Sequence, residues 1–328
     1  MRRFIVALAC ASFALACAPA VSARAQALRL EAKIPLGSVK GRIDHLAVDV
    51  QHRRLFVAEL GNDTVGVVDL AAGKTIPTLG GQHEPQGVAY LPARDTLFVA
   101  SGGDGMLRLY GGADLAAKGA IPIGDDADNV RIDPATGHVL VGWGSGAIAM
   151  VDPAVDRVIG QIELKAHPES FRLDETSQRA FVNIPNAHAI AVINLASKTQ
   201  TAAWTPGLAA ANFPMAVAPD GRVLIVTRLP AKLVAFDPKT GAVVADAPTC
   251  GDSDDLFFDA GRGRAYVSCG DGHVDVFTVK DSSFDRIDHV ATVQGARTSL
   301  FVPELDRLYV AVRANRTEPA AIWVYRPE

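Results

Sequence analysis

Polar and charged side chains recur along the chain at intervals of 41 to 43 residues, each just before a short apolar run. The seven places carry different chemical groups, which include carboxylates, amides, an imidazole and a guanidinium. Unlike polar groups that converge on one place are typical of a small-molecule site. The candidate ligand-binding residues are Asp44, His45, Gln86, Asp128, Asn129, Glu169, Asn212, Asp254, Asp255 and Arg297.

Four of these candidates are well-separated acids: Asp44, Asp128, Glu169 and Asp254. Carboxylates that surround one site repel one another, which raises their pKa values unless a cation balances them. Carboxylate oxygens are also the ligands that hard cations prefer, so a divalent cation is one candidate cofactor. Arg297 offers an alternative, because a guanidinium can either balance the acids or hold a ligand carboxylate through two parallel hydrogen bonds.

The same residues also allow catalysis. His45 would act as a general base, Glu169 as its partner or as a second acid–base group, and Arg297 would stabilise an oxyanion. The sequence contains no H-E-x-x-H motif, no G-x-S-x-G motif and no cysteines with metal-site spacing. A third interpretation is that these side chains cap backbone amides and hold water. This interpretation fits Gln86, Glu169 and Arg297 least well, because long side chains cap backbone amides poorly. Whether the protein is an enzyme stays open.

Seven strand-like segments follow the polar positions, and each ends in a small or polar residue, as in Leu55-Phe56-Val57-Ala58. The segments begin at residues 55, 97, 139, 180, 224, 265 and 308, so they are 41 to 44 residues apart. Self-similarity at this period is typical of a β-propeller, whose blades are four-stranded sheets. Turns rich in Gly, Asn and Asp separate the strands. We therefore predict an all-β, seven-bladed β-propeller, with the polar positions around the mouth of its central channel.

The last repeat unit is incomplete, because the chain stops at Glu328 before a fourth strand. Residues 30–37 match the outer strand of an internal unit at residues 117–124. We therefore predict that the N-terminal strand of the mature chain closes the last blade, which leaves the ring without a gap. The expected propeller domain spans residues 26–328.

Residues 1–25 are typical of a secretory signal peptide. Arg2 and Arg3 precede an apolar run at residues 4–18, and Ala23-Arg24-Ala25 fits an A-x-A cleavage site. Because the apolar run is too short to span a membrane, we expect a mature chain without a transmembrane segment. The sequence predicts a periplasmic or secreted protein, with a lipoprotein attached through Cys17 as the weaker alternative.

Charge and cysteine usage support this compartment. Loss of residues 1–25 removes three arginines and no acid, so the formal net charge changes from −4 to −7. An acidic surface repels phosphate backbones, so we expect no nucleic-acid partner. The mature chain keeps only Cys250 and Cys269, and an exported chain with two cysteines favours a disulfide between them. We expect a monomer.

The segment Ala180-Phe181-Val182-Asn183, followed by an apolar strand at residues 190–195, resembles the YVTN-repeat (YncE-like) exported β-propellers. The pattern returns at residues 233–241, and the resemblance covers residues 28–328. In this chain the tyrosine is often phenylalanine, and the terminal asparagine occurs only at Asn183. The resemblance implies a periplasmic or surface location and the binding of a ligand or another exported protein.

The main functional hypothesis is a binding or interaction module that holds a small polar ligand or a cation at the channel mouth. The alternative is a hydrolase. Seven-bladed lactonases are similar in using a His, Glu and Arg set at the channel mouth, which His45, Glu169 and Arg297 match by residue type alone. Fold does not decide between these two functions, because propellers serve many of them.

Overall fold

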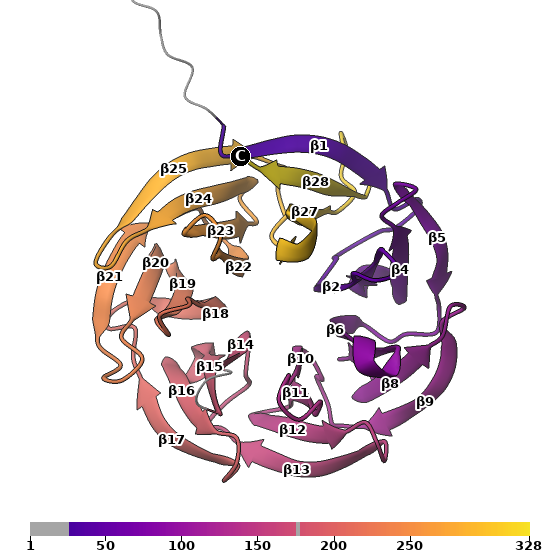
Figure 1. The fold of residues 1–328 in the computed structure, drawn as a ribbon, viewed down its shortest axis with the longest axis horizontal. Helices are drawn as coiled ribbons and strands as arrows, with labels where there is room; N and C mark the ends of the chain where they lie inside the picture. Colours follow the sequence, from indigo (N-terminus) through magenta and orange to yellow (C-terminus); the bar gives the residue numbers. More distant parts are fainter. Residues whose placement is uncertain (1–25, 175–177) are drawn as a thin grey trace, which may run out of the picture.

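The computed structural model describes residues 26–174 and 178–328. Within these ranges, 28 strands form seven four-stranded antiparallel sheets, arranged as blades around a central axis (Figure 1). The prediction of an all-β, seven-bladed β-propeller is confirmed. In blades 1 to 6 the chain runs outward from the axis, so the first strand of each blade is the innermost and the fourth is the outermost (Figure 1).

The strands of the first four blades are β2 (Leu46–Asp49), β3 (Arg54–Glu59), β4 (Thr64–Asp69) and β5 (Lys74–Leu79); β6 (Pro85–Leu91), β7 (Thr96–Ser101), β8 (Met106–Gly111) and β9 (Ala116–Pro122); β10 (Val130–Ile132), β11 (Val139–Trp143), β12 (Ala147–Asp152) and β13 (Arg157–Glu163); and β14 (Phe171–Asp174), β15 (Arg179–Ile184), β16 (Ala189–Asn194) and β17 (Thr199–Trp204). The remaining blades contain β18 (Ala210–Val217), β19 (Val223–Leu229), β20 (Ala231–Phe236) and β21 (Val243–Pro248); β22 (Ser253–Asp259), β23 (Arg264–Cys269), β24 (His273–Val279) and β25 (Phe284–Ala291); and β26 (Ser299–Val302), β27 (Arg307–Val312), β28 (Ala321–Pro327) and β1 (Leu28–Pro35). The loops of the described residues contain four single-turn 3₁₀ helices: η1 (Leu60–Asn62), η2 (Pro92–Arg94), η3 (Pro185–Ala187) and η4 (Pro303–Leu305).

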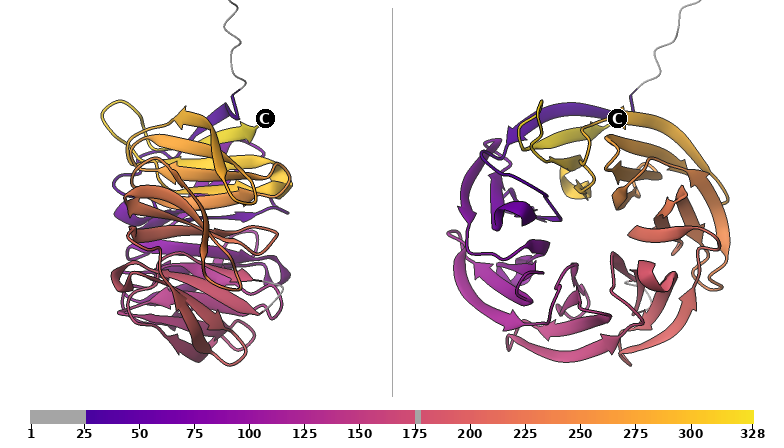
Figure 2. Two further views of the ribbon diagram at one scale, coloured as in Figure 1. Left: turned by 90° about the vertical axis from the view of Figure 1, so that its left-hand side faces the viewer. Right: turned by 180° about the vertical axis from the view of Figure 1, so that it is seen from behind.

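The seventh blade is assembled from both ends of the described chain. Strand β1 pairs antiparallel with β28, and the register runs from Leu28 opposite Pro327 to Pro35 opposite Ala321. The front view and the view from behind agree that β1 begins beside the C-terminus (Figures 1 and 2). The outer strand of this blade therefore comes from the start of the described chain.

The core lies between the blades. In the described residues, seven buried apolar clusters form, and each spans the interface between two neighbouring blades. The second strands supply several of the largest buried side chains, among them Phe56, Phe98 and Phe181, all with 0 % exposure. Burying a phenylalanine fully contributes about 1.5–3 kcal/mol, so each repeat is stabilised chiefly by its neighbours.

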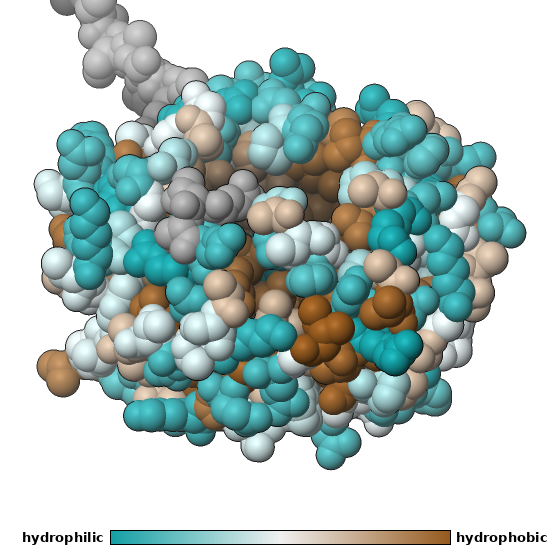
Figure 3. All heavy atoms as spheres, turned by 60° about the horizontal axis from the view of Figure 1, so that its bottom comes forward, coloured by the Kyte–Doolittle hydropathy of each residue, from teal (hydrophilic) through white to brown (hydrophobic). Residues whose placement is uncertain are grey.

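The face shown in Figure 3 carries mostly hydrophilic side chains, with hydrophobic ones in separate small groups. In the described part of the chain, no helix has the length and apolar character that a membrane crossing would need. The predicted signal peptide at residues 1–25, with Cys17, lies outside the described residues. The predicted disulfide is confirmed: Cys250 and Cys269 are bonded, with their Cα atoms 5.8 Å apart.

Asn183 joins two blades through a fully buried amide. Its Nδ2 donates to the carbonyl oxygens of Phe213 and Pro214 at 3.0 Å each, and its Oδ1 accepts a bond of 2.9 Å from Asn212 Nδ2. These groups lie away from water, because Asn183 and Asn212 both have 0 % exposure. A buried donor or acceptor that loses its partner costs about 1–3 kcal/mol.

We expect Asn183→Ala to lower the free energy of unfolding by about 3 kcal/mol, because two carbonyls and one amide lose their partner together. Denaturant unfolding measures this loss. Asn62→Ala serves as the matched control, since Asn62 is exposed and bonds only Thr64, and we expect it to cost less than about 0.5 kcal/mol. Equal losses in the two variants would contradict this role for Asn183.

Candidate functional site

The predicted site residues lie where the inner strands begin, and backbone pairing with the second strand of the same blade holds several of them. The amide of Asp44 donates to Ala58 O at 2.7 Å, that of Asp128 to Gly142 O at 2.9 Å, and that of Glu169 to Asn183 O at 2.9 Å. A side chain on Gly87 would overlap the carbonyl of Asp128, so glycine allows the second and third inner strands to approach closely. The seven strand starts thus surround one channel mouth.

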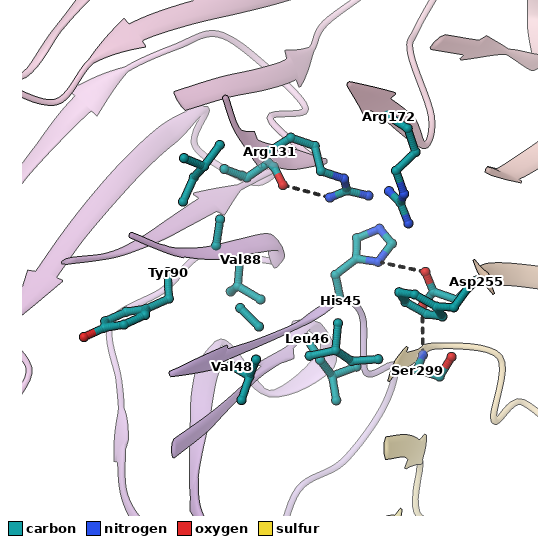
Figure 4. Close-up of a pocket in the computed structure, with 15 residues that line it drawn as sticks. His45, Leu46, Val48, Val88, Tyr90, Arg131, Arg172, Asp255 and Ser299 are labelled. Atoms are coloured by element: carbon teal, nitrogen blue, oxygen red, sulfur yellow. Dashed lines mark hydrogen bonds and ion pairs between the residues drawn. The ribbon is translucent and has the colours of Figure 1, made fainter. Parts of the chain in front are cut away.

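The inner strands and the residues directly before them line the central channel. These positions bring His45, Asp255, Arg131 and Arg172 into one cavity of about 310 Å³ (Figure 4). Apolar side chains such as Val88 and Phe257 form its other walls. A small cavity with mainly apolar walls and a few convergent polar groups is typical of a ligand site.

Arg131 and Arg172 point toward His45 from one side of this cavity (Figure 4). Arg131 donates to Phe171 O at 3.2 Å, to Val130 O at 2.7 Å and to Asn129 Oδ1 at 3.0 Å. Arg172 donates to Ser170 Oγ at 3.3 Å and to Phe171 O at 3.1 Å. All of these acceptors are uncharged, and within the described residues neither guanidinium forms an ion pair.

The two arginines therefore carry positive charge into the channel without a contacting carboxylate. Burial and, next, the neighbouring charge of Arg172 lower the pKa of Arg131, and burial lowers the pKa of Arg172. Both shifts mean that burial makes the charged forms less favourable than they are in water. A bound anion would remove this penalty.

His45 adds a third cation. Burial alone would lower its pKa, but Asp255, Asp44 and Asp128 outweigh burial and raise the pKa of His45 to about 9. Its Nδ1 lies 3.8 Å from Asp255 Oδ1, and the Ser299 amide donates to Asp255 Oδ2 at 2.8 Å, which fixes that carboxylate (Figure 4). At neutral pH the cavity therefore holds three cationic groups and one anionic group.

The mouth carries the opposite charge. Burial raises the pKa of Asp44 to about 6, although the charges of His45 and Arg42 act in the opposite direction. The Arg42 guanidinium donates to Asp44 Oδ2 at 2.5 Å. Burial, followed by Asp128 and Asp254, raises the pKa of Glu169 to about 7. Within the described chain Glu169 has no hydrogen-bond or ion-pair partner at its carboxylate.

Asp128 behaves differently from these acids. Burial would raise its pKa, but His167 and His45 outweigh burial and hold the pKa of Asp128 below its usual value. Its Oδ2 lies 4.0 Å from His167 Nε2. Its Oδ1 has no hydrogen-bond partner, although the side chain is only 10 % exposed. This ionised, partly unsatisfied carboxylate can accept a donor from a ligand.

Three predicted residues have other contacts. Arg297 contacts two acids of the sixth blade, with Nη1 2.9 Å from Asp252 Oδ1 and Nε 2.9 Å from Asp254 Oδ2. Asn212 belongs to the buried contact with Asn183, away from the cavity. Gln86 donates to Asp126 Oδ1 at the mouth, at 3.2 Å. Of the ten predicted ligand residues, His45 and Asp255 line the cavity itself.

The four mouth acids do not form a ready-made metal site. In the described residues, the group of His, Cys, Asp and Glu ligand atoms that lies within 4.8 Å consists of Cys250, Cys269 and Asp271. Both of these cysteines are bonded to each other. The acids at the mouth are therefore spread more widely than a compact coordination sphere requires.

Four residues at the site, Arg131, Arg172, His167 and Arg228, were not among the predicted ligand residues. Arg228 bonds Asp254 Oδ1 at 2.8 Å and stacks over Phe213 at 3.8 Å. The sequence pattern could have indicated Arg131 and Arg172, because each arginine stands between two apolar residues of an inner strand, as in Val130-Arg131-Ile132. Strand alternation places such a residue on the axis.

Comparisons with known proteins support the fold. No family model matches the chain, and no curated protein matches it. Among solved structures, the chain is similar to a chain of Kuenenia stuttgartiensis hydrazine synthase, with a TM-score of 0.74, 15 % identity, and coverage of 84 % of this chain and 93 % of that one. It is also similar to a chain in the crystal structure of a mitotic checkpoint complex, with a TM-score of 0.76, 14 % identity, and coverage of 97 % and 98 %. At these identities the similarity shows a shared β-propeller fold, a fold compatible with a binding or interaction module.

Proposed function

We propose that this protein is an exported binding module that holds a small anionic molecule, through a carboxylate or phosphate group, in its central channel. The observation that carries the proposal is the convergence of Arg131 and Arg172 on one cavity without an ion-pair partner among the described residues. Guanidinium groups match carboxylate and phosphate geometry through paired hydrogen bonds. Two such groups and a protonated His45 favour an anion at their centre.

Export is supported by the disulfide and by the signal-like sequence. A bond between Cys250 and Cys269 forms and persists in oxidising compartments such as the bacterial periplasm. Residues 1–25 have the layout of a cleaved signal peptide. The resemblance to YVTN-repeat propellers is consistent with both points.

The alternative, a lactonase-like hydrolase, has less support. It requires His45, Glu169 and Arg297 to act on one substrate, yet within the described residues no hydrogen bond or ion pair joins any two of them. Arg297 is already paired with Asp252 and Asp254. His45 is protonated at neutral pH, which is unsuited to a general base.

Isothermal titration of residues 26–328 with inorganic phosphate and with pentanoate tests the proposal. We expect one site for each anion, and an affinity for pentanoate that falls above pH 9, by up to about tenfold per pH unit, as His45 loses its proton. The sign follows from the raised pKa, because the anion binds the protonated imidazole more tightly. The charged groups that face or surround this imidazole are Arg131, Arg172, Asp44, Asp128, Glu169, Asp254 and Asp255.

A cation of similar size, 1,5-diaminopentane, is the control ligand. Binding of either anion with the stated pH dependence supports the proposal. Absence of heat and of thermal stabilisation with both anions, at concentrations up to several millimolar, would overturn it. Binding of the diamine alone would also overturn it, since the ligand would then be a cation held by the mouth acids.

A further inference from the structure

The channel carries two belts of opposite charge on the same two strands. Asp128 precedes β10 and Arg131 lies within it, while Glu169 precedes β14 and Arg172 lies within that strand. Each acid is three residues before its arginine, which corresponds to about 10 Å of extended backbone. An acidic level at the mouth therefore lies above a basic level in the cavity.

The acidic level has carboxylate oxygens without a hydrogen-bond partner among the described residues, although His167 Nε2 lies 4.0 Å from the other oxygen of Asp128. Asp128 Oδ1 is buried and has no partner, and the carboxylate of Glu169 has no partner within the described residues. Buried polar atoms in native proteins almost always have a hydrogen-bond partner, so an unsatisfied carboxylate oxygen points to a bound donor.

An ammonium group fits this level better than a metal ion. The acids do not bring their ligand atoms within 4.8 Å of one another in the described residues. A divalent cation needs several oxygens at 2–2.6 Å, whereas an ammonium has three N–H donors that reach separate acceptors over longer distances. The acidic level therefore suits the amine end of a small molecule.

We infer that the channel binds a dipolar ligand, a linear molecule with an ammonium group at one end and a carboxylate at the other. The ammonium contacts Asp128 and Glu169, and the carboxylate contacts Arg131 and Arg172. This inference rests on the proposed function and names its ligand class. An α-amino acid is too short to reach both levels, because its two charged groups are attached to one carbon, so the ligand is an ω-amino acid with several methylene groups. The apolar walls at Val88 and Phe257 suit that methylene chain.

Titration calorimetry at pH 8 with three probes of matched length tests the inference: 5-aminopentanoate, pentanoate and glutarate. At this pH Glu169, with a pKa of about 7, is ionised, and His45, with a pKa of about 9, is protonated. A hydrogen bond between charged groups strengthens binding more than one between neutral groups. We therefore expect 5-aminopentanoate to bind at least about tenfold more tightly than pentanoate, and glutarate to bind more weakly than 5-aminopentanoate.

A pair of variants tests where the ammonium group of 5-aminopentanoate binds. We expect Glu169→Gln to lower the affinity for 5-aminopentanoate about tenfold and to bring its advantage over pentanoate close to one. The matched control is Glu304→Gln, since Glu304 is an exposed glutamate in η4, remote from the cavity lining. We expect this control to keep the preference for 5-aminopentanoate.

The outcomes separate this inference from the proposed function. Equal binding of pentanoate and 5-aminopentanoate would overturn the dipolar ligand and leave the anion-binding channel intact. Tighter binding of glutarate than of 5-aminopentanoate would do the same. If no carboxylate probe binds, the inference fails; if inorganic phosphate does not bind either, the proposed function fails with it.

Discussion

Replacing Arg131 and Arg172 together with methionine is expected to weaken binding of pentanoate at least about a hundredfold. Each guanidinium would lose a charged hydrogen bond to the ligand, worth about 1.5–3 kcal/mol, and methionine keeps much of the side-chain volume. Titration calorimetry at pH 7 measures the loss. We expect the lysine pair, Arg131→Lys with Arg172→Lys, to give an intermediate affinity, because it keeps the charge without the paired donors.

The same methionine variant should not lose stability. Its two cations repel each other and contact uncharged acceptors, so their removal is expected to leave the free energy of unfolding unchanged or to raise it by about 1 kcal/mol. Arg157→Met with Arg326→Met is the control, since both residues are exposed on the strands β13 and β28. Undiminished binding in the channel variant would place the ligand elsewhere.

This opposition between stability and binding is itself an argument for function. A purely structural channel would place apolar side chains, or pairs of opposite charge, at the positions of Arg131 and Arg172. At the comparable axial positions the first and second blades have Ala47 and Ala89. Local departures from the pattern that stabilises a fold are expected at functional sites.

The fold could be predicted because the same strand pattern repeats along the chain. One strand pattern, such as residues 55–58 within β3, carries little information, but seven copies at 41 to 44 residues exclude most other architectures. The disulfide between Cys250 and Cys269 could be predicted for a similar reason, since the two loops that hold them follow from the repeat.

The site could be predicted only in part, because local irregularities decide which side chains face the axis. Strand β18 has a register shift between Asn212 and Met215, so Asn212 turns toward the neighbouring blade. Pro214 lies inside the irregular segment, and proline in an inner strand is typical of a bulge. The repeat period predicts the same pattern for all seven inner strands, so it does not reveal the irregularity of β18.

Ion pairs between neighbouring blades are the second reason why the site could be predicted only in part. Arg297 was expected to be available for a ligand, yet it bonds Asp252 and Asp254, which precede it by 45 and 43 residues. Arg228, near the end of β19, contacts the same two acids. These contacts depend on how loops of adjacent blades meet, which spacing along one chain does not encode.

Removing the disulfide is expected to cost about 3 kcal/mol in free energy of unfolding. Cys250 and Cys269 are separated by 19 residues, and closing a loop of this size restricts the unfolded chain by roughly that amount. The bond also holds the segment before β22 against the end of β23, where the Cys250 amide donates to Asp275 Oδ2 at 2.9 Å. Denaturant unfolding of the double variant Cys250→Ala with Cys269→Ala measures the effect.

Wild-type protein with and without a strong thiol reductant completes the experiment. We expect the reductant to lower wild-type stability by a similar amount and to leave the double variant unchanged. Because Asp254 and Asp255 lie on the strand that the bond orders, loss of the bond should also weaken anion binding in the channel. Identical unfolding curves for oxidised and reduced wild type would show that blade packing alone holds this segment, and the disulfide would then no longer support an oxidising location.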